Sequence, residues 1–366
     1  MPHSNKLESL WPDNKPDFDR LLKVFCRDGL PDRVPFIELF ADMEIIGAVL
    51  GEETIHYSNE DRAQREAMYL QRIRFCCKVA WDFVWVPVSI PFTQEYIRAD
   101  DTAALSRGKR NWVNAASGIV NSWEDFENYP WPTAGDVHYD DYEFVSKNLP
   151  EGMKMIASSG GMLEWVMWLM GFVPFAMGIY EQPDLIAGLF DRIGEIHAEV
   201  YDIVAGMPDV GAFFLGDDMG YKSGTFIKPE HMRRYVFPKQ KMLAEITHKH
   251  GLPFLLHACG NLEAIMDDLI EDVGIDGRHS FEDVILPVGE AKRRYGKRVS
   301  ILGGVDMDML ASSSEEQVRL YTRRVLEECM PGGGYALGTG NSVANYIPLS
   351  NYLAMLDEGM KVGRYS

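Results

Sequence analysis

The stretch LLHACGN, residues 255–261, places a histidine and a cysteine two positions apart at the end of an apolar run. Residues i and i+2 of a β-strand face the same side, so the imidazole of His257 and the thiol of Cys259 can reach one cation together. Nitrogen and sulfur are ligands that zinc commonly takes, and a catalytic zinc keeps one coordination position open. A hydrogen-bonded histidine beside a buried thiol is the alternative, because free cysteine is often buried.

Acidic residues and a second histidine occur close to this motif or in similar positions along the chain. Glu282 follows in HSFED, and we predict it as the third zinc ligand; a solvated acid at a helix start is the alternative. His279 precedes it and could instead be the ligand or the partner of a ligand, and it is also a candidate catalytic residue. Asp217 and Asp218 are adjacent in LGDDMG and would point to opposite faces of a strand, so we expect one of them to face a pocket as a catalytic acid. An ordinary turn acid is the alternative for this pair.

Eight short apolar runs alternate with stretches of helical periodicity. Near-continuous apolar runs are typical of strands that are buried on both faces, as in a parallel sheet covered by helices. Eight of them in about 330 residues favour a (β/α)8 barrel over an open doubly wound sheet. The runs are RVPFIEL (33–39), WDFVWVPV (81–88), GMKMIASS (152–159), VGAFFLGDD (210–218), LPFLLHAC (252–259), GIDGRHS (274–280), RVSILGGVD (298–306) and GGYALGTGN (333–341).

The C-terminal ends of the strands carry the active site in barrels of this class. Besides the residues above, the predicted strand ends carry Glu38, Asp306 and Asn341, and we predict that these three contact the substrate. We predict a single domain over residues 1–366. Within it, residues 1–32 form an N-terminal helical extension and residues 89–150 an insertion between the second and third strands.

The apolar stretch at 161–178 raises the question of a membrane span. It contains Glu164 and internal glycines and lacks basic flanks, so we predict a buried helix instead. Helical spacing places Trp165, Trp168 and Phe172 on one face of that helix. We predict that this face roofs the substrate pocket, and core packing is the alternative.

Charge and cysteine content limit the classes of partner. The chain has 36 Lys and Arg residues against 55 Asp and Glu residues, a formal net charge of −19. Such a surface repels phosphate backbones and anionic lipid, so nucleic-acid and membrane roles are disfavoured. Five irregularly spaced cysteines and no leader resembling a signal peptide predict free thiols in the cytoplasm. Whether the chain forms a homodimer is left open.

The motifs LLHACGN, GIDGRHSFED, ILGGVD and the closing PGGGYALGTGN resemble those of the uroporphyrinogen decarboxylase superfamily, over roughly residues 33–359. The resemblance implies a (β/α)8 barrel. True uroporphyrinogen decarboxylases carry an Arg-Gln-Ala-Gly-Arg motif after the first strand, which holds the carboxylates of their substrate. Here that region has Glu38, Asp42 and Glu44 and no arginine cluster, so the resemblance argues against that activity.

The chain is more similar to the zinc-dependent methyltransferases of this superfamily. Their H-x-C motif matches His257 and Cys259, and in the related cobalamin-independent methionine synthase a glutamate at the position of Glu282 binds zinc. A further cysteine is expected after the last strand, where this sequence has Asn341. Replacing a thiolate by a neutral amide leaves zinc a stronger Lewis acid, better suited to an oxygen leaving group.

The resemblance therefore implies a methyltransferase that moves a methyl group from a small donor, such as an aryl methyl ether, to a corrinoid protein. The chain has no D-x-H-x-x-G corrinoid-binding motif, so cobalamin is expected on a partner protein. Two alternatives stay open. One is a metal-free decarboxylase of a small carboxylate substrate with Asp217 or Asp218 as the charged group, and the other is a barrel that has lost catalysis and serves as a binding protein.

Overall fold

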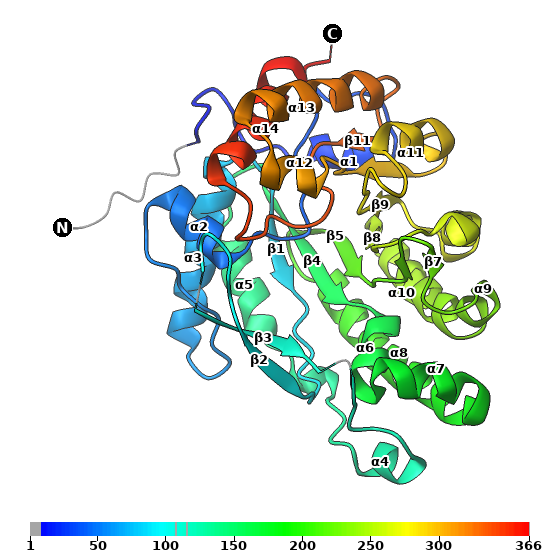
Figure 1. Cartoon of the computed structure of the whole chain (residues 1–366). Coiled ribbons are helices and arrows are strands. Elements are labelled where there is room, and N and C mark those ends of the chain that lie inside the picture. The colour runs from blue at the N-terminus through cyan, green and yellow to red at the C-terminus, as the bar shows by residue number, and fades with distance from the viewer. Residues whose placement is uncertain (1–8, 107, 115, 366) are drawn as a thin grey trace.

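A curled parallel sheet of seven strands forms the centre of the molecule (Figure 1). The structure is a computed structural model that describes residues 9–106, 108–114 and 116–365. The strands follow one another in space in chain order, and each is paired in parallel with its neighbours. They are β1 (Phe83–Pro87), β4 (Lys154–Gly160), β5 (Val210–Gly216), β8 (Phe254–His257), β9 (Gly277–His279), β10 (Ser300–Leu302) and β11 (Tyr335–Ala336). Six lie within predicted runs and β4 extends one residue beyond its run, and the predicted α/β class is confirmed.

The first predicted strand, 33–39, does not form a regular strand. It lies beside β11 through one parallel bridge between Phe36 and Leu337 and through two backbone hydrogen bonds of 2.9 Å, Ile37 N to Leu337 O and Leu337 N to Pro35 O. Pro35 has no N–H to donate, which limits the ladder that this segment can form. Within the described residues the strand ladder runs from β1 to β11 and is not closed into a ring. The structure therefore supports a curled parallel sheet of seven strands with an eighth segment beside it, and does not show the closed barrel that was predicted.

Buried ion pairs connect the two sides of this seam. Asp82, directly before β1, is fully buried, and its Oδ2 lies 3.1 Å from Arg33 Nη2 at the start of the first segment. Its Oδ1 lies 3.0 Å from Arg20 Nη1. Because Arg33 is also buried, these contacts hold the first segment against β1 where strand pairing is missing.

Helices pack on the outer face of the sheet. For example, α3 contacts β1, α5 contacts β4, α10 contacts β8 and α11 contacts β10. The helices are α1 (Asp19–Phe25), α2 (Met43–Leu50), α3 (Arg62–Lys78), α4 (Trp123–Asn128), α5 (Tyr139–Asn148), α6 (Met162–Met170), α7 (Phe172–Glu181), α8 (Pro183–Ala205), α9 (Pro229–His231), α10 (Phe237–Lys249), α11 (Val288–Tyr295), α12 (Met307–Ser312), α13 (Glu315–Cys329) and α14 (Leu349–Val362). Shorter or wider helical turns are η1 (Ala134–Asp136), η2 (Met232–Val236), η3 (Glu263–Ile265) and η4 (Asp268–Val273).

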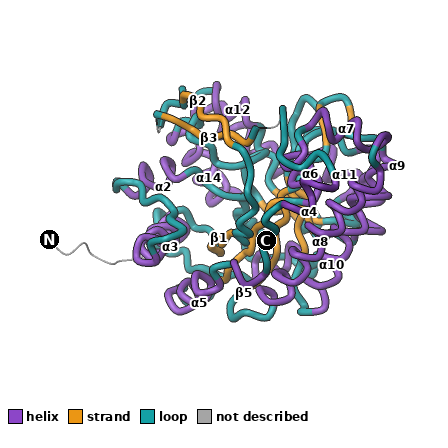
Figure 2. The backbone as a smooth tube through the Cα atoms, turned by 90° about the horizontal axis from the view of Figure 1, so that it is seen from below, coloured by secondary structure: helices purple, strands orange, loops and turns teal. Residues whose placement is uncertain are grey.

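The segment predicted as an insertion, 89–150, begins with an antiparallel hairpin of β2 (Tyr96–Asp100) and β3 (Lys109–Val113). It continues through α4, η1 and α5. Asn345, in the loop after β11, connects to the hairpin because its Nδ2 donates to Asp101 Oδ2 at 2.8 Å. Figure 2 looks onto the C-terminal ends of the strands and shows β2 and β3 on one side of this face. A second small hairpin joins β6 (Gly220–Tyr221) and β7 (Gly224–Thr225).

The apolar stretch predicted as one helix is two helices, α6 and α7, with a bend of 99° at Gly171. Trp165 and Trp168 lie on α6, whereas Phe172 begins α7 and packs against Tyr221 at a ring distance of 6.1 Å. The prediction that Trp165, Trp168 and Phe172 lie on one face of a single helix is therefore wrong for Phe172. Among the described residues, no single helix is both long and apolar enough to span a membrane, and α6 with α7 reaches that length and hydropathy only as this bent pair.

The seam predicts a large stability effect for Asp82→Asn. The substitution would leave Arg33 buried without a full counter-charge, and breaking a buried pair in this way typically costs about 3–5 kcal/mol. Urea unfolding should show this loss. The control Asp13→Asn, at an exposed position, should change the free energy of unfolding by less than about 0.5 kcal/mol. A loss at position 82 as small as that of the control would contradict the role of the pair.

Candidate metal centre

Three side chains at the C-terminal ends of two neighbouring strands form a compact group. Asp218 follows β5, His257 ends β8, and Cys259 stands two residues further on. One ligand atom from each lies within 4.8 Å of the others. His257 Nε2 is 3.6 Å from Cys259 Sγ and 3.5 Å from Asp218 Oδ1. His257 is buried, but Asp218 and Cys259 are only partly buried, so the group is open on one side.

A hydrogen bond between two buried imidazoles determines which atom of His257 faces this group. His279 Nε2 lies 3.2 Å from the carbonyl oxygen of Thr339, which can only accept, so this nitrogen carries the proton of a neutral ring. His279 Nδ1 is then an acceptor, and His257 Nδ1, 2.8 Å away, must donate to it. Burial lowers the pKa of His257 to about 3, so the ring is neutral. Its Nε2 therefore presents a lone pair to Asp218 and Cys259, as a metal ligand requires.

Glu38 stands at the far end of the same chain of contacts. Its carboxyl accepts from Thr339 N at 2.8 Å and from Thr339 Oγ1 at 2.6 Å. Burial raises the pKa of Glu38 to about 8, and the two hydrogen bonds from Thr339 act in the opposite direction. Glu38 was predicted to contact substrate, but the structure places it behind the site. There it holds the loop whose carbonyl orients His279.

Two further side chains contact the sulfur of Cys259. Asn341 Nδ2 lies 3.3 Å from Sγ and Ser280 Oγ lies 3.4 Å from it. Burial raises the pKa of the Cys259 thiol to about 12, and the charge of Asp218 adds to this. A bound cation would reverse that balance, since metal ligation deprotonates a thiol. Asn341 thus occurs beside Cys259, where it donates a hydrogen bond to the sulfur.

The structure gives two other predicted acids a structural role. Asp217 accepts from the backbone N–H groups of Leu163 and Glu164, at 3.0 and 3.1 Å from its Oδ1, and so caps α6. Gly161 is required beside it, because a Cβ there would lie 2.0 Å from Asp217 Cγ. Asp306 caps α12 by accepting from Asp308 N at 2.9 Å. Neither carboxylate is a member of the Asp218–His257–Cys259 group.

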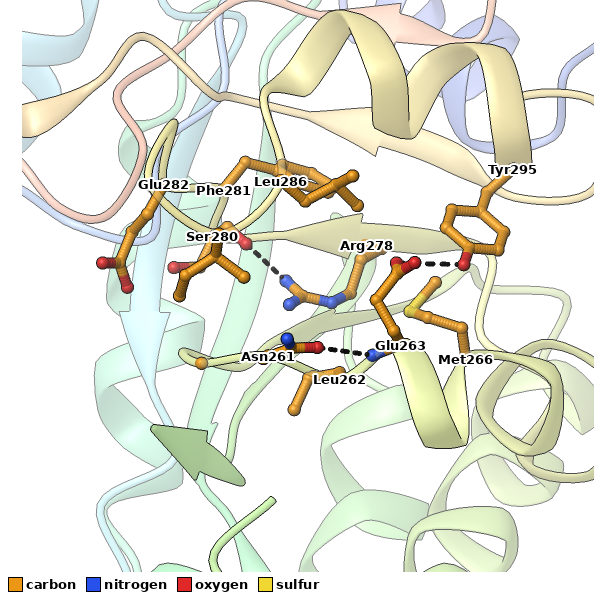
Figure 3. Close-up of a pocket in the computed structure, with 12 residues that line it drawn as sticks. Asn261, Leu262, Glu263, Met266, Arg278, Ser280, Phe281, Glu282, Leu286 and Tyr295 are labelled. Carbon is orange, nitrogen blue, oxygen red and sulfur yellow. Dashed lines mark hydrogen bonds between the residues drawn. The ribbon is translucent and has the colours of Figure 1, made fainter. Parts of the chain in front are cut away.

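Glu282 is not brought into the group either, and Asp218 is the carboxylate found there. Ser280 directly after β9 has a φ of 84°, which turns the chain away from the direction of the strand. The carbonyl of Glu282 then accepts from Ile285 N and Leu286 N, both at 2.9 Å. Its side chain lines a separate cavity with Arg278 (Figure 3). The geometry gives no support to Glu282 as a zinc ligand.

A cavity of about 320 Å3 opens at the ends of β1, β4 and β5 and reaches Gly216, two residues before Asp218. Its walls are mostly apolar, with Ser158, Ser159 and Glu164 as polar groups. Burial raises the pKa of Glu164 well above its usual range, and the neighbouring charges of Asp218 and Asp217 add to this. The sequence offered Glu164 only as an interruption of an apolar stretch, and nothing in that pattern placed it at a cavity.

The two tryptophans predicted to roof a pocket lie close to this cavity. Trp165 and Trp168 meet edge to face with ring centroids 4.9 Å apart, and Trp165 also packs against Phe92 at 4.5 Å. A Cβ on Gly160, which lines the cavity, would lie 2.9 Å from Trp165 Nε1. Trp165 therefore supports the cavity wall, and contact of either ring with substrate stays a prediction.

The chain belongs to the uroporphyrinogen decarboxylase (URO-D) family, whose model matches residues 114–361. Uroporphyrinogen decarboxylase of Thioalkalivibrio sulfidiphilus is 29% identical over 147 residues, which are 38% of this chain and 40% of that protein. The enzyme of Alkalilimnicola ehrlichii is 25% identical over 185 residues, 49% of this chain and 47% of that protein. The chain thus spans less than half the length of the curated relatives it matches.

Among solved structures, a methyltransferase from Methanosarcina mazei has the same fold, with a TM-score of 0.66. It is 15% identical in sequence, and the alignment covers 93% of this chain and 97% of that one. The predicted resemblance to this superfamily is confirmed by the family match, and the chain shares its fold with a methyltransferase.

The buried carboxyl of Glu38 predicts a pH dependence of stability. In the native state it keeps its proton up to about pH 8, whereas in the unfolded chain it ionises near pH 4.5. Its contribution is therefore complete below pH 4.5 and is lost as the pH rises towards 8, by up to about 1.4 kcal/mol per pH unit. Urea unfolding of Glu38→Gln between pH 5 and 8 should show a flatter dependence than the wild type. Parallel curves would show that Glu38 is ionised in the native protein.

Proposed function

We propose that this chain is a zinc-dependent methyltransferase that moves a methyl group from a small donor to a corrinoid protein. The observation that carries the proposal is the convergence of Asp218, His257 and Cys259 at the C-terminal ends of β5 and β8. Zinc is the cation that fits this set best, since imidazole, thiolate and carboxylate groups are all usual protein ligands of zinc. Bound there, zinc would supply Lewis-acid polarisation of the oxygen that leaves the methyl group.

The surrounding residues would hold the ligands ready. His279 fixes the ring of His257 with its Nε2 lone pair facing the group, and the backbone N–H of Cys259 donates to Asp218 Oδ1 at 2.7 Å. These contacts leave few rotamers for the side chains of His257 and Asp218, so these two ligands need little ordering when a cation binds. Asn341 contacts the sulfur as a hydrogen-bond donor, so we infer that three protein ligands bind the metal and a fourth position stays open for substrate.

The cavity at the ends of β1, β4 and β5 would bind the methyl donor. Its apolar walls suit a small organic molecule, and Glu164, whose pKa is raised by burial, is the acidic group that lines it. We infer that the methyl end of the donor lies in this cavity.

The corrinoid partner would approach over the C-terminal face of the sheet, because the group is open on that side. The chain is strongly acidic, so a basic docking surface on the partner would speed association. Five cysteines without a disulfide fit a reducing compartment, and we infer the cytoplasm.

A metal-free decarboxylase of a small carboxylate is the second candidate, because the curated relatives are uroporphyrinogen decarboxylases. Asp217 is an unfavourable charged group for it, since that carboxylate is occupied by the start of α6 and by Gln240. The first segment also places buried Glu38 and Asp42, and no arginine cluster, at this end of the sheet. Metal content separates the two candidates.

Zinc titration of the metal-free protein against a chromophoric chelator tests the metal centre. We expect one equivalent to bind, and Cys259→Ala to weaken binding by at least about 100-fold, since even changes behind the ligands cost 10–100-fold. The matched control Cys26→Ala, at an exposed thiol, should bind as the wild type does. Equal affinity of the Cys259→Ala variant would remove Cys259 from the centre.

Methyl transfer can be followed with reduced cob(I)alamin in place of the partner protein. The zinc-loaded wild type should form methylcobalamin from at least one of methanol, methoxybenzene and methoxyacetate, and Cys259→Ala should lose this activity while staying folded. Circular dichroism checks the fold. A protein that binds no zinc, transfers no oxygen-bound methyl group and releases CO2 from a carboxylic acid would favour the metal-free decarboxylase.

A further inference from the structure

Arg278, on β9, is a buried guanidinium with no carboxylate partner. Its side chain is 3% exposed, and no acid among the described residues forms an ion pair with it. Nη1 donates to the carbonyl of Ser280 at 2.9 Å, and Nε has no hydrogen-bond partner. Burial lowers the pKa of Arg278 to about 10, while the nearby Cys259 and Asp218 act in the opposite direction without forming an ion pair with it, so the group is a cation at pH 7. A buried charge left in this way is costly unless something offsets it.

The guanidinium lies in a cavity between the loop after β8 and the loop after β9. Figure 3 shows it between Ser280 and Asn261, with Tyr295 at the side. The cavity is small, about 20 Å3, which is room for one water-sized group such as the head of a small anion. The remainder of any larger ligand must extend out of the cavity.

The two acids that line the cavity do not neutralise Arg278. Glu263 is already bound to Arg294 and to Tyr295 OH, the latter at 3.0 Å. In Figure 3 the carboxylate of Glu282 points away from the guanidinium. Asn261 adds a second donor, because its Oδ1 accepts from Glu263 N at 3.2 Å and its amide N–H2 group is left for another acceptor.

Ser280 connects this cavity to the candidate metal centre. Its carbonyl accepts from Arg278, and its hydroxyl lies 3.4 Å from Cys259 Sγ. Ser280 also lines the cavity, so a ligand whose anionic end meets Arg278 would pass Ser280 to reach the metal centre.

We infer that the cavity beside Arg278 is a subsite for the carboxylate group of a small ligand whose other end reaches the Asp218–His257–Cys259 group. The second half of this inference rests on the proposed function. A carboxylate fits because a guanidinium and an amide N–H2 group would both donate to it, and charge-assisted bonds of this kind are the strong ones. A cationic head group would be repelled by the guanidinium, and an uncharged one would leave its charge without a counter-charge.

Acetate is the probe for the subsite itself. We would titrate it into the full-length protein, freed of metal with a chelator, and follow binding by saturation-transfer NMR. The wild type should bind acetate saturably, and Arg278→Met should weaken binding at least tenfold. The matched control Arg192→Met removes a partly exposed arginine on α8, remote in sequence from the cavity residues, and should bind as the wild type does. Equal binding by the wild type and Arg278→Met, or no binding by either, overturns the subsite.

Two further measurements keep the test independent of folding and of the anion used. Asn261→Ala leaves the buried charge of Arg278 in place and should weaken acetate binding several-fold. An unchanged affinity would argue against the amide of Asn261 as the second donor to the carboxylate. Chloride should compete poorly, because a single spherical ion does not offer the two separate acceptor atoms of a carboxylate. Equal competition by chloride overturns the carboxylate assignment.

Methoxyacetate tests the link to the metal centre. With zinc bound, it should bind more tightly than acetate, and this gain should disappear in Cys259→Ala. A protein that binds acetate at Arg278 but no zinc leaves the subsite standing and removes the proposed function. A protein that binds zinc but not acetate removes the subsite and leaves the proposed function standing.

Discussion

The hydrogen bond between the imidazoles of His257 and His279 decides whether this site can bind a metal at all. If its direction were reversed, the Nε2 atom of His257 would carry a proton and could not be a ligand. The direction is fixed from behind, because the carbonyl of Thr339 must accept from His279, and Glu38 holds Thr339 by two bonds. Glu38 and Thr339 lie behind the site, but the lone pair of His257 Nε2 depends on their contacts with His279.

The sheet brings these side chains together because the C-terminal ends of parallel strands meet at one edge. Asp218 and His257 come from neighbouring strands, β5 and β8, and His279 from the next, β9. Close approach of backbone and ring is needed at the same edge: a Cβ on Gly303, whose φ is 73°, would lie 2.6 Å from His279 Nε2. The buried pairs of Asp82 support this edge indirectly, since they hold the segment that contains Glu38 against β1.

Sequence patterns predicted the strands better than the site. Seven apolar runs were sufficient for seven strands, but Pro35 limited the pairing of the first run, and Gly171 broke a stretch with continuous helical periodicity. The i, i+2 spacing brought His257 and Cys259 together. Chain order suggested Glu282 as their acid, whereas the structure places Asp218 there, because Ser280 turns the chain after β9. Arg278 gave no signal, since the pattern of a buried strand does not reveal what a charged side chain meets behind it.

The zinc K-edge X-ray absorption spectrum of the protein loaded with one equivalent of zinc tests the central claim most directly. The geometry predicts a first shell with one sulfur at about 2.3 Å and nitrogen or oxygen atoms at about 2.0–2.2 Å, from Cys259, His257 and Asp218. A shell of nitrogen and oxygen alone, or the spectrum of hydrated zinc, would contradict it.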